Sequence, residues 1–136
     1  MVFSKSLERF VKNRAQFRCE YCLFPENWSD LPFAIDHIVA RQHRGRTRVE
    51  NLAFSCGTCN RHKGPNIAGI DPVSKQLTRL FNPRIDQWQD HFEYRGAVIK
   101  GRTAIGRTSV VVFDMNRLSS RLARQSLLQI GSLPRK

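Results

Sequence analysis

The segments CEYC at residues 19–22 and CGTC at residues 56–59 are two Cys-x2-Cys knuckles, and the stretch 19–63 that contains them decides the fold. Two such pairs, a few tens of residues apart, match the ligand count of a closed tetrahedral zinc site. Its four thiolates would lie at ~2.3 Å from the metal, and no position would be left for a substrate. We therefore expect a structural zinc ion with four ligands: Cys19, Cys22, Cys56 and Cys59.

Between the knuckles lies the segment FAIDHIV at residues 33–39. This short β-branched and apolar run follows Pro32 and precedes an arginine-rich loop, which predicts a strand. The strand contains Asp36 and His37, and burial of a carboxylate is costly unless a metal or a donor satisfies it. Because a buried carboxylate in an apolar strand needs such a partner, we infer a functional site at Asp36 and His37. Strict alternation would direct the two side chains to opposite faces, so they can share a site only at a strand end or a bulge.

Residues 57–64 predict a short helix that ends at Gly64, with Pro65 after it. On such a helix Asn60 and Lys63 are three residues apart on one face, whereas His62 points away from Asn60. Of the two candidate ligands, we expect Asn60 rather than His62 to face the strand.

The charge balance favours a polyanionic partner. The 136 residues include 23 Lys and Arg against 11 Asp and Glu, which gives a formal net charge of +12. A membrane surface is the competing polyanion. However, we find no apolar run near ~18 residues. We expect DNA, and no membrane, as the partner. The candidate contacts are Arg41, Arg44, Arg46 and Arg48 in the loop, and Arg61 and Lys63 in the helix.

The length predicts one domain, residues 1–136, because domains usually have about 100–200 residues. We find no secretion signal at Met1, and in a reducing compartment paired Cys-x2-Cys motifs are more often metal ligands than disulfides. We therefore expect a cytoplasmic protein. Nothing in the sequence decides the oligomeric state.

The flanking segments are predicted from periodicity and turn residues. Residues 4–17 predict an amphipathic helix capped by Ser4, and residues 23–32 predict an irregular loop with Trp28 packed against the core. Further on we expect a turn or short helix at 74–81, a short helix at 86–91 and a strand at 92–100. Residues 103–116 fit a strand or a helix, and a basic amphipathic helix then runs from Leu118 to Gly131.

Together the knuckles, DHIV at 36–39, NL at 51–52 and CNRHKG at 59–64 resemble the HNH endonucleases over residues 17–66. The accessory extension 67–136 is similar to the tail of a bacterial subgroup of small stand-alone HNH proteins, which favours a helix near residues 106–116. The fold class that the resemblance implies is α+β. It has a ββα-metal HNH core stapled by the four-cysteine zinc site, an N-terminal helix and a mostly helical C-terminal extension.

The resemblance also implies a role for each matched residue. His37 matches the general base that activates water, and Asp36 matches a ligand of one catalytic divalent ion, Mg²⁺ or Mn²⁺. Asn51 matches the asparagine that braces the hairpin loop and so orients His37. Asn60 stands where many members have histidine and others asparagine, which makes the chain an H-N-N variant. The second metal ligand is then Asn60, with His62 as the fallback.

The expected function is metal-dependent hydrolysis of DNA phosphodiester bonds, by nicking or by double-strand cutting. The family implies products with 5′-phosphate and 3′-hydroxyl ends. The alternative from another class is a zinc-stabilised, non-catalytic nucleic-acid-binding module. A module without catalytic activity would not need Asp36 and His37 and could have lost either one. This chain has both residues, which favours the enzyme. A third hypothesis is a redox protein that uses the Cys-x2-Cys pairs as its redox groups. We would then expect a thioredoxin-like βαβ pattern, which we do not find.

Overall fold

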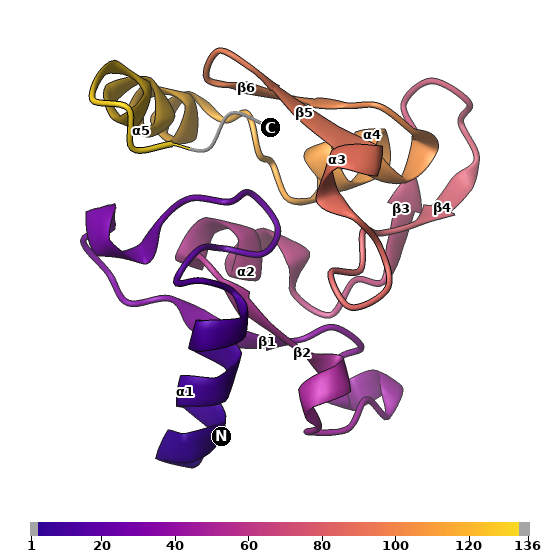
Figure 1. Cartoon of the computed structure of the whole chain (residues 1–136). Helices are drawn as coiled ribbons and strands as arrows, with labels where there is room; N and C mark the ends of the chain where they lie inside the picture. The colour runs from indigo at the N-terminus through magenta and orange to yellow at the C-terminus, as the bar shows by residue number, and fades with distance from the viewer. Residues whose placement is uncertain (1–2, 134–136) are drawn as a thin grey trace.

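The computed structural model describes residues 3–133, and its centre is a β-hairpin followed directly by a helix (Figure 1). Strands β1 (Ala34–His37) and β2 (Leu52–Ser55) are antiparallel, with Asp36 opposite Ala53 and His37 opposite Leu52. Helix α2 (Gly57–Lys63) begins two residues after β2 and ends at Gly64. This arrangement confirms the predicted α+β class with short antiparallel sheets.

Helix α1 (Lys5–Arg14) packs against β2 and confirms the predicted N-terminal helix. Ser4 caps its first turn by accepting a hydrogen bond from the backbone N–H of Leu7. From the last turn, the guanidinium of Arg14 donates to the carbonyls of Val49 and Leu52 at 2.7 Å each. The helix therefore fixes the place where the chain enters β2.

The extension after residue 66 combines two hairpins with helices. Strand β3 (Ala68–Ile70) pairs with β4 (Leu77–Arg79), and β5 (Phe92–Arg95) pairs with β6 (Val98–Gly101). The helices are α3 (Trp88–His91), α4 (Ala104–Val112) and α5 (Leu118–Gln129).

Three local predictions are wrong. Residues 77–79 form a strand where a turn or short helix is predicted, and residues 92–101 form a hairpin rather than one strand. The chain reverses at Gly96, whose φ of +60° suits glycine. Trp28 is 51% exposed instead of packed against the core.

Helix α4 forms although its VVV run is typical of a strand. Thr103 caps it by accepting a hydrogen bond from the backbone N–H of Gly106 at 3.0 Å. At Gly106 the helix lies so close to the end of α3 that a Cβ atom would be 1.9 Å from the carbonyl oxygen of His91. Tertiary packing and the cap therefore override the intrinsic preference of the valines.

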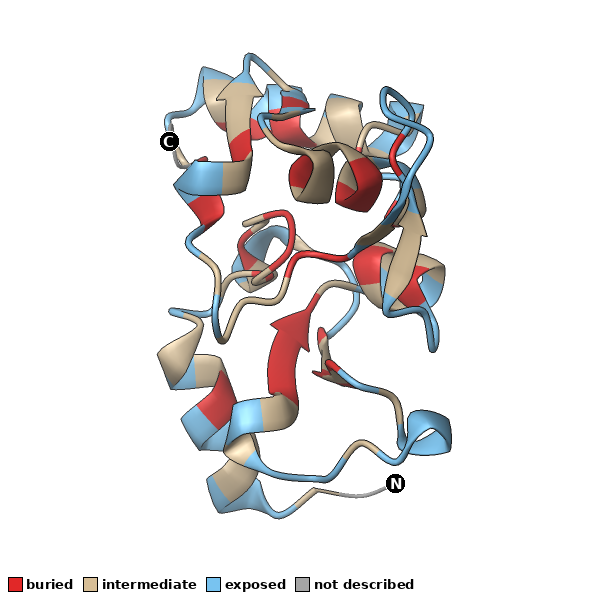
Figure 2. Ribbon diagram, turned by 90° about the vertical axis from the view of Figure 1, so that its right-hand side faces the viewer, coloured by how far each residue is buried: buried red, intermediate tan, exposed pale blue. Residues whose placement is uncertain are grey.

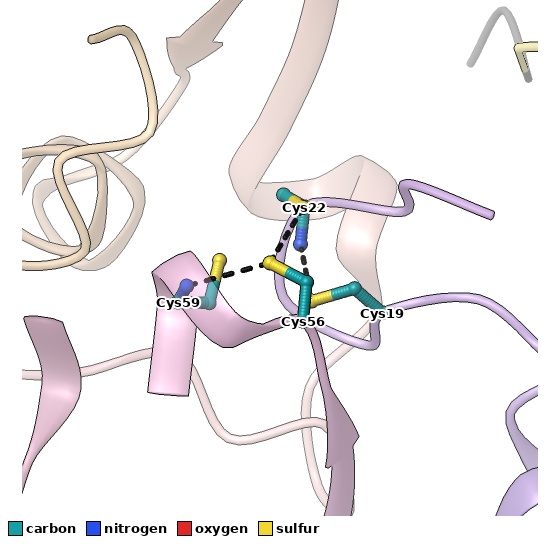
Figure 3. Close-up of side chains that lie close together, drawn as sticks. All are labelled: Cys19, Cys22, Cys56 and Cys59. Atoms are coloured by element: carbon teal, nitrogen blue, oxygen red, sulfur yellow. Dashed lines mark hydrogen bonds between the residues drawn. The ribbon is translucent and has the colours of Figure 1, made fainter. Parts of the chain in front are cut away.

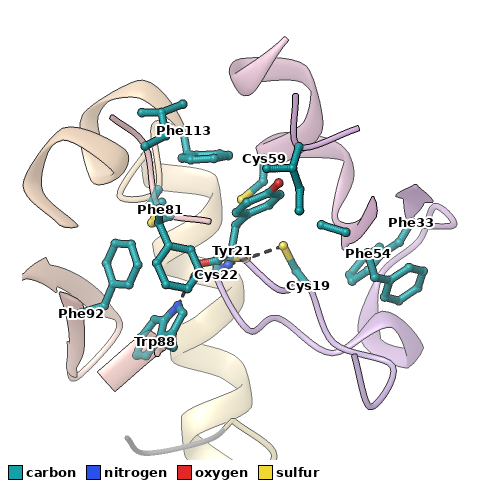
Figure 4. Close-up of a cluster of buried hydrophobic side chains, with 14 of the residues drawn as sticks. Cys19, Tyr21, Cys22, Phe33, Phe54, Cys59, Phe81, Trp88, Phe92 and Phe113 are labelled. Carbon is teal, nitrogen blue, oxygen red and sulfur yellow. Dashed lines mark hydrogen bonds between the residues drawn. The ribbon is translucent and has the colours of Figure 1, made fainter. Parts of the chain in front are cut away.

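One cluster of buried side chains connects the hairpin with the extension. The buried residues, red in Figure 2, include all of β2 and lie in the interior where the two parts meet. Figure 4 shows Tyr21 next to Phe113, with ring centroids 4.6 Å apart, and Phe81, Trp88 and Phe92 beyond them. Within residues 3–133 no helix is long and apolar enough to cross a membrane.

Candidate active site

The two knuckles bring their four cysteine sulfurs together, as Figure 3 shows. These sulfurs all lie within 4.8 Å of one another, and Cys22 Sγ is 3.8 Å from Cys56 Sγ. Four sulfurs at ~2.3 Å from a tetrahedral zinc ion would be about 3.8 Å apart. None of the four cysteines forms a disulfide. The cluster is therefore consistent with the predicted structural zinc site.

Asp36 lies within β1 and is only 6% exposed. The hydroxyl of Tyr21 donates to its Oδ2 at 2.7 Å, and the ammonium of Lys63 is 3.1 Å from the same oxygen. Oδ1 has only a longer contact with Lys63, at 3.4 Å. Burial raises the pKa of Asp36, while the charge of Lys63 and the hydrogen bond from Tyr21 oppose that rise. Oδ1 is thus the oxygen with the weaker protein partner.

The structure corrects the prediction that Lys63 contacts DNA. Its side chain is 2% exposed, and its ammonium also donates to the carbonyl of His37 at 3.1 Å. Helix α2 packs the face that bears Lys63 against β1, where a buried carboxylate needs an opposite charge. Lys63 is therefore an internal counter-charge for Asp36.

His37 ends β1 beside the hairpin loop. Its Nε2 is 2.9 Å from the hydroxyl oxygen of Thr47, and its ring centroid is 5.9 Å from that of Phe3. Burial lowers the pKa of His37; the charge of Asp36 opposes this effect, and Arg41 and Lys63 add to it. The neutral ring, which is the form that accepts a proton, is thereby favoured near pH 7.

Asn51 closes the hairpin loop 38–51. Its side-chain oxygen accepts from the backbone N–H of Val39 at 2.9 Å, and its Nδ2 donates to the carbonyls of Val39 and Arg46 at 3.0 and 2.8 Å. Gly45 also approaches closely, because a Cβ atom there would lie 1.7 Å from the carbonyl oxygen of Val39. The loop that contains Thr47 is therefore held against the end of β1.

A shallow hollow of about 340 Å³ lies where β1, the loop and α2 meet. Asp36, His37 and Asn60 all line it. The neighbouring residues Asp36 and His37 therefore reach one hollow at the end of β1, which is one of the two arrangements that the sequence allowed. The lining residues are Ile35, Asp36, His37, Ala40, Arg41, Gln42, Asn60, Gly64 and Pro65.

His62 lies outside this hollow. Its Nδ1 is 2.8 Å from the carbonyl oxygen of Thr58, and its Nε2 is 3.7 Å from the carboxylate of Asp114. A second hollow of similar volume lies between the knuckles and α5, but neither Asp36 nor His37 lines it. The geometry thus favours Asn60 over His62 as a partner of Asp36.

The remaining predicted DNA contacts are at the surface. The four loop arginines are exposed, Arg41 borders the hollow, and Arg61 on α2 is also exposed. Their contact with DNA stays a prediction.

Sequence reasoning missed two residues of the site, Tyr21 and Thr47. Tyr21 lies inside the first knuckle, 15 residues before Asp36, and the only signal was a hydroxyl-bearing aromatic residue between two metal ligands. Thr47 lies among the loop arginines, where the sequence carried no signal for its contact with His37.

Comparison with known families identifies this region. Residues 19–66 match the family described as HNH endonuclease, over both knuckles, β1, β2 and α2. The chain therefore contains an HNH endonuclease domain at residues 19–66, which indicates a phosphodiester hydrolase acting on nucleic acid. This match confirms the predicted family and enzyme class. No curated protein and no solved structure matches the chain significantly.

Proposed function

We propose that this chain is a metal-dependent endonuclease that hydrolyses DNA phosphodiester bonds at the hollow between β1 and α2. The observation that carries the proposal is the meeting of Asp36, His37 and Asn60 in that hollow, within the HNH domain. The net charge of +12 supports a polyanionic substrate, and the four unpaired cysteines suit the reducing cytoplasm as its location.

His37 acts as the general base in this proposal. Its lowered pKa keeps the ring neutral near pH 7, and Thr47 engages Nε2, so that Nδ1 takes the proton from the attacking water. A general base contributes about 10²–10⁴-fold in rate. Asn51 is a positioning residue, because its three hydrogen bonds hold the loop that contains Thr47.

Asp36 and Asn60 offer hard oxygen donors at one hollow, which suits Mg²⁺ or Mn²⁺. When bound, such an ion supplies charge stabilisation for the phosphate and for the leaving 3′ oxygen. Among the lining residues Asp36 is the one carboxylate, and Lys63 already offsets its charge. The donor set therefore suits one divalent ion rather than two.

Arg41 is placed to bind the phosphate that is cleaved, because its exposed guanidinium borders the hollow. The other loop arginines and Arg61 would bind flanking phosphates, which position the duplex without reading its sequence. Attack of water on phosphorus with departure of the 3′ oxygen leaves 5′-phosphate and 3′-hydroxyl ends.

The experiment that tests the proposal is relaxation of supercoiled plasmid by the zinc-loaded protein with Mg²⁺, Mn²⁺ or EDTA. His37→Ala is compared with His43→Ala, a matched control because His43 is exposed in the hairpin loop 38–51 and does not line the hollow. Zinc content and circular dichroism are measured for each protein, so that a lost fold is not read as lost catalysis.

We expect wild type and His43→Ala to yield open-circle or linear DNA only with added divalent ion, and His37→Ala to yield neither. If no protein cleaves but all bind DNA with the same salt dependence, the catalytic proposal fails. The zinc-stabilised binding module would then be the better description.

A further inference from the structure

We infer that Tyr21 is a positioning residue that couples the zinc knuckle to the divalent-ion site by holding the Asp36 carboxylate in place. This inference rests on the proposed function, because it takes Asp36 as a ligand of the catalytic ion.

The position of Tyr21 in the chain ties it to zinc. It lies between Cys19 and Cys22, so two of the four sulfur ligands fix its backbone on either side. The indole N–H of Trp88 donates to the carbonyl of Tyr21 at 2.9 Å, and the ring of Phe113 is stacked on the tyrosine ring at 4.6 Å. The Tyr21 side chain is fully buried, with 0% of its surface exposed, so this packing restricts its movement relative to the knuckle.

The hydroxyl of Tyr21 acts directly on Asp36. It donates to Oδ2 at 2.7 Å, while the ammonium of Lys63 contacts the same oxygen at 3.1 Å. Two donors thus hold Oδ2, whereas Oδ1 has only the longer contact with Lys63 at 3.4 Å, so we assign Oδ1 to the cation. A donor that packing already holds in place orients a metal ligand at little cost in entropy.

Loss of zinc would therefore weaken divalent binding, because the knuckle and Asp36 share one hydrogen bond and the two metal sites are not independent. By linkage the effect is reciprocal, and a divalent ion at Asp36 would tighten the binding of zinc by the same factor. Removing such a supporting contact typically costs about 10–100-fold in metal affinity.

The test is Mn²⁺ binding to zinc-loaded protein, measured by calorimetry and by electron paramagnetic resonance. Tyr21→Phe removes the hydroxyl and keeps the ring that packs on Phe113. Tyr94→Phe is the matched control, since its hydroxyl donates to the carbonyl of Cys22 in the same knuckle and makes no contact with Asp36. We expect Tyr21→Phe to bind Mn²⁺ about 10–100-fold more weakly at full zinc content, and Tyr94→Phe to match wild type.

Asp36→Ala separates this inference from the proposed function. If Asp36→Ala abolishes Mn²⁺ binding and Tyr21→Phe binds as tightly as wild type, the role of Tyr21 is overturned and Asp36 remains a ligand. If wild type binds no Mn²⁺, or Asp36→Ala binds it unchanged, the metal assignment fails and the inference falls with it.

A second measurement needs no variant and covers the case in which Tyr21→Phe does not fold. The zinc affinity of the wild-type protein is measured by equilibrium competition with a zinc-selective chelator, with and without Mn²⁺. We expect tighter zinc binding with Mn²⁺. An unchanged zinc affinity, under conditions where Mn²⁺ is bound, would overturn the coupling.

Discussion

Lys63 and Asp36 form an ion pair of 3.1 Å inside the protein, with side chains that are 2% and 7% exposed. Removing one partner of such a pair leaves the other charge buried without compensation, and this typically costs about 3–5 kcal/mol. We expect Lys63→Met to lower the free energy of unfolding by about that amount in urea denaturation of zinc-loaded protein.

The matched control is Lys100→Met, because Lys100 is exposed on β6 and forms no ion pair with any residue in the range 3–133. It should change the free energy of unfolding by less than about 0.5 kcal/mol. Equal losses in the two variants would contradict the buried role of Lys63.

The pH dependence of cleavage follows from His37. Burial holds the pKa of His37 below the ordinary value of 6.5, and only the neutral ring takes a proton from water. The rate should therefore rise with pH, with its inflection below 6.5, and fall as the ring protonates on the acid side. Single-turnover rates at saturating Mg²⁺, with zinc content checked at each pH, measure this. An inflection above 6.5 would be inconsistent with the proposed base.

Motif spacing predicted part of the arrangement of the hairpin and α2. It allowed Asp36 and His37 to share a site at a strand end or at a bulge and preferred Asn60 to His62, and Asp36, His37 and Asn60 all line the hollow. Spacing could not show that Lys63 is buried, because a helix face does not reveal which side chain lies opposite it. The contact of Tyr21 with Asp36 depends on how the first knuckle folds onto β1, which no local pattern encodes.

At the level of elements, the hairpin loop depends on the close approach of Gly45 to the end of β1. A Cβ atom at Gly45 would lie 1.7 Å from the carbonyl oxygen of Val39, whereas one at Gly57 would meet nothing within 4 Å. We expect Gly45→Ala to displace the loop, break the bonds of Asn51 and reduce cleavage, since it moves Thr47 away from His37. Gly57→Ala should keep full activity.

Amide hydrogen exchange measures the displacement directly. The N–H of Val39, which Asn51 protects, should exchange faster in Gly45→Ala than in Gly57→Ala. Unchanged protection together with unchanged cleavage would show that the loop tolerates the extra methyl group.

In the extension, sequence patterns alone do not predict which segments become strands and which become helices. Gly96 turns the β5–β6 hairpin and Thr103 caps α4, but the partners that decide between strand and helix lie elsewhere in the chain. Hairpin β3–β4 packs on α4 through Gly69, where a Cβ atom would be 2.6 Å from Val112. Such contacts between distant segments explain why 77–79 is a strand despite its weak periodicity.

For the molecule as a whole, we propose that the chain folds as one domain. The buried cluster runs from Val11 in α1 to Met115 after α4, and the indole of Trp88 and the hydroxyl of Tyr94 donate to knuckle carbonyls. Removing zinc should therefore unfold the hairpin and the extension together, because ligand binding and folding are coupled in such sites.

Circular dichroism and NMR during zinc titration check this prediction, with Cys59→Ser as the variant that lacks one ligand. One transition shared by all resolved signals is expected. If amide signals of α4 and β6 stay dispersed after zinc is lost, the extension is an independent unit.

The hydrogen bond from Trp88 to the first knuckle also makes Trp88 an intrinsic fluorescence probe of the zinc site. The chain has two tryptophans; Trp88 is 7% exposed beside Tyr21, and Trp28 is 51% exposed. When the knuckle opens, the indole of Trp88 enters water and its fluorescence should move to longer wavelength, while Trp28 changes little. In a Trp28→Phe variant, the emission wavelength of Trp88 alone would then report zinc occupancy in real time, without a dye or a label.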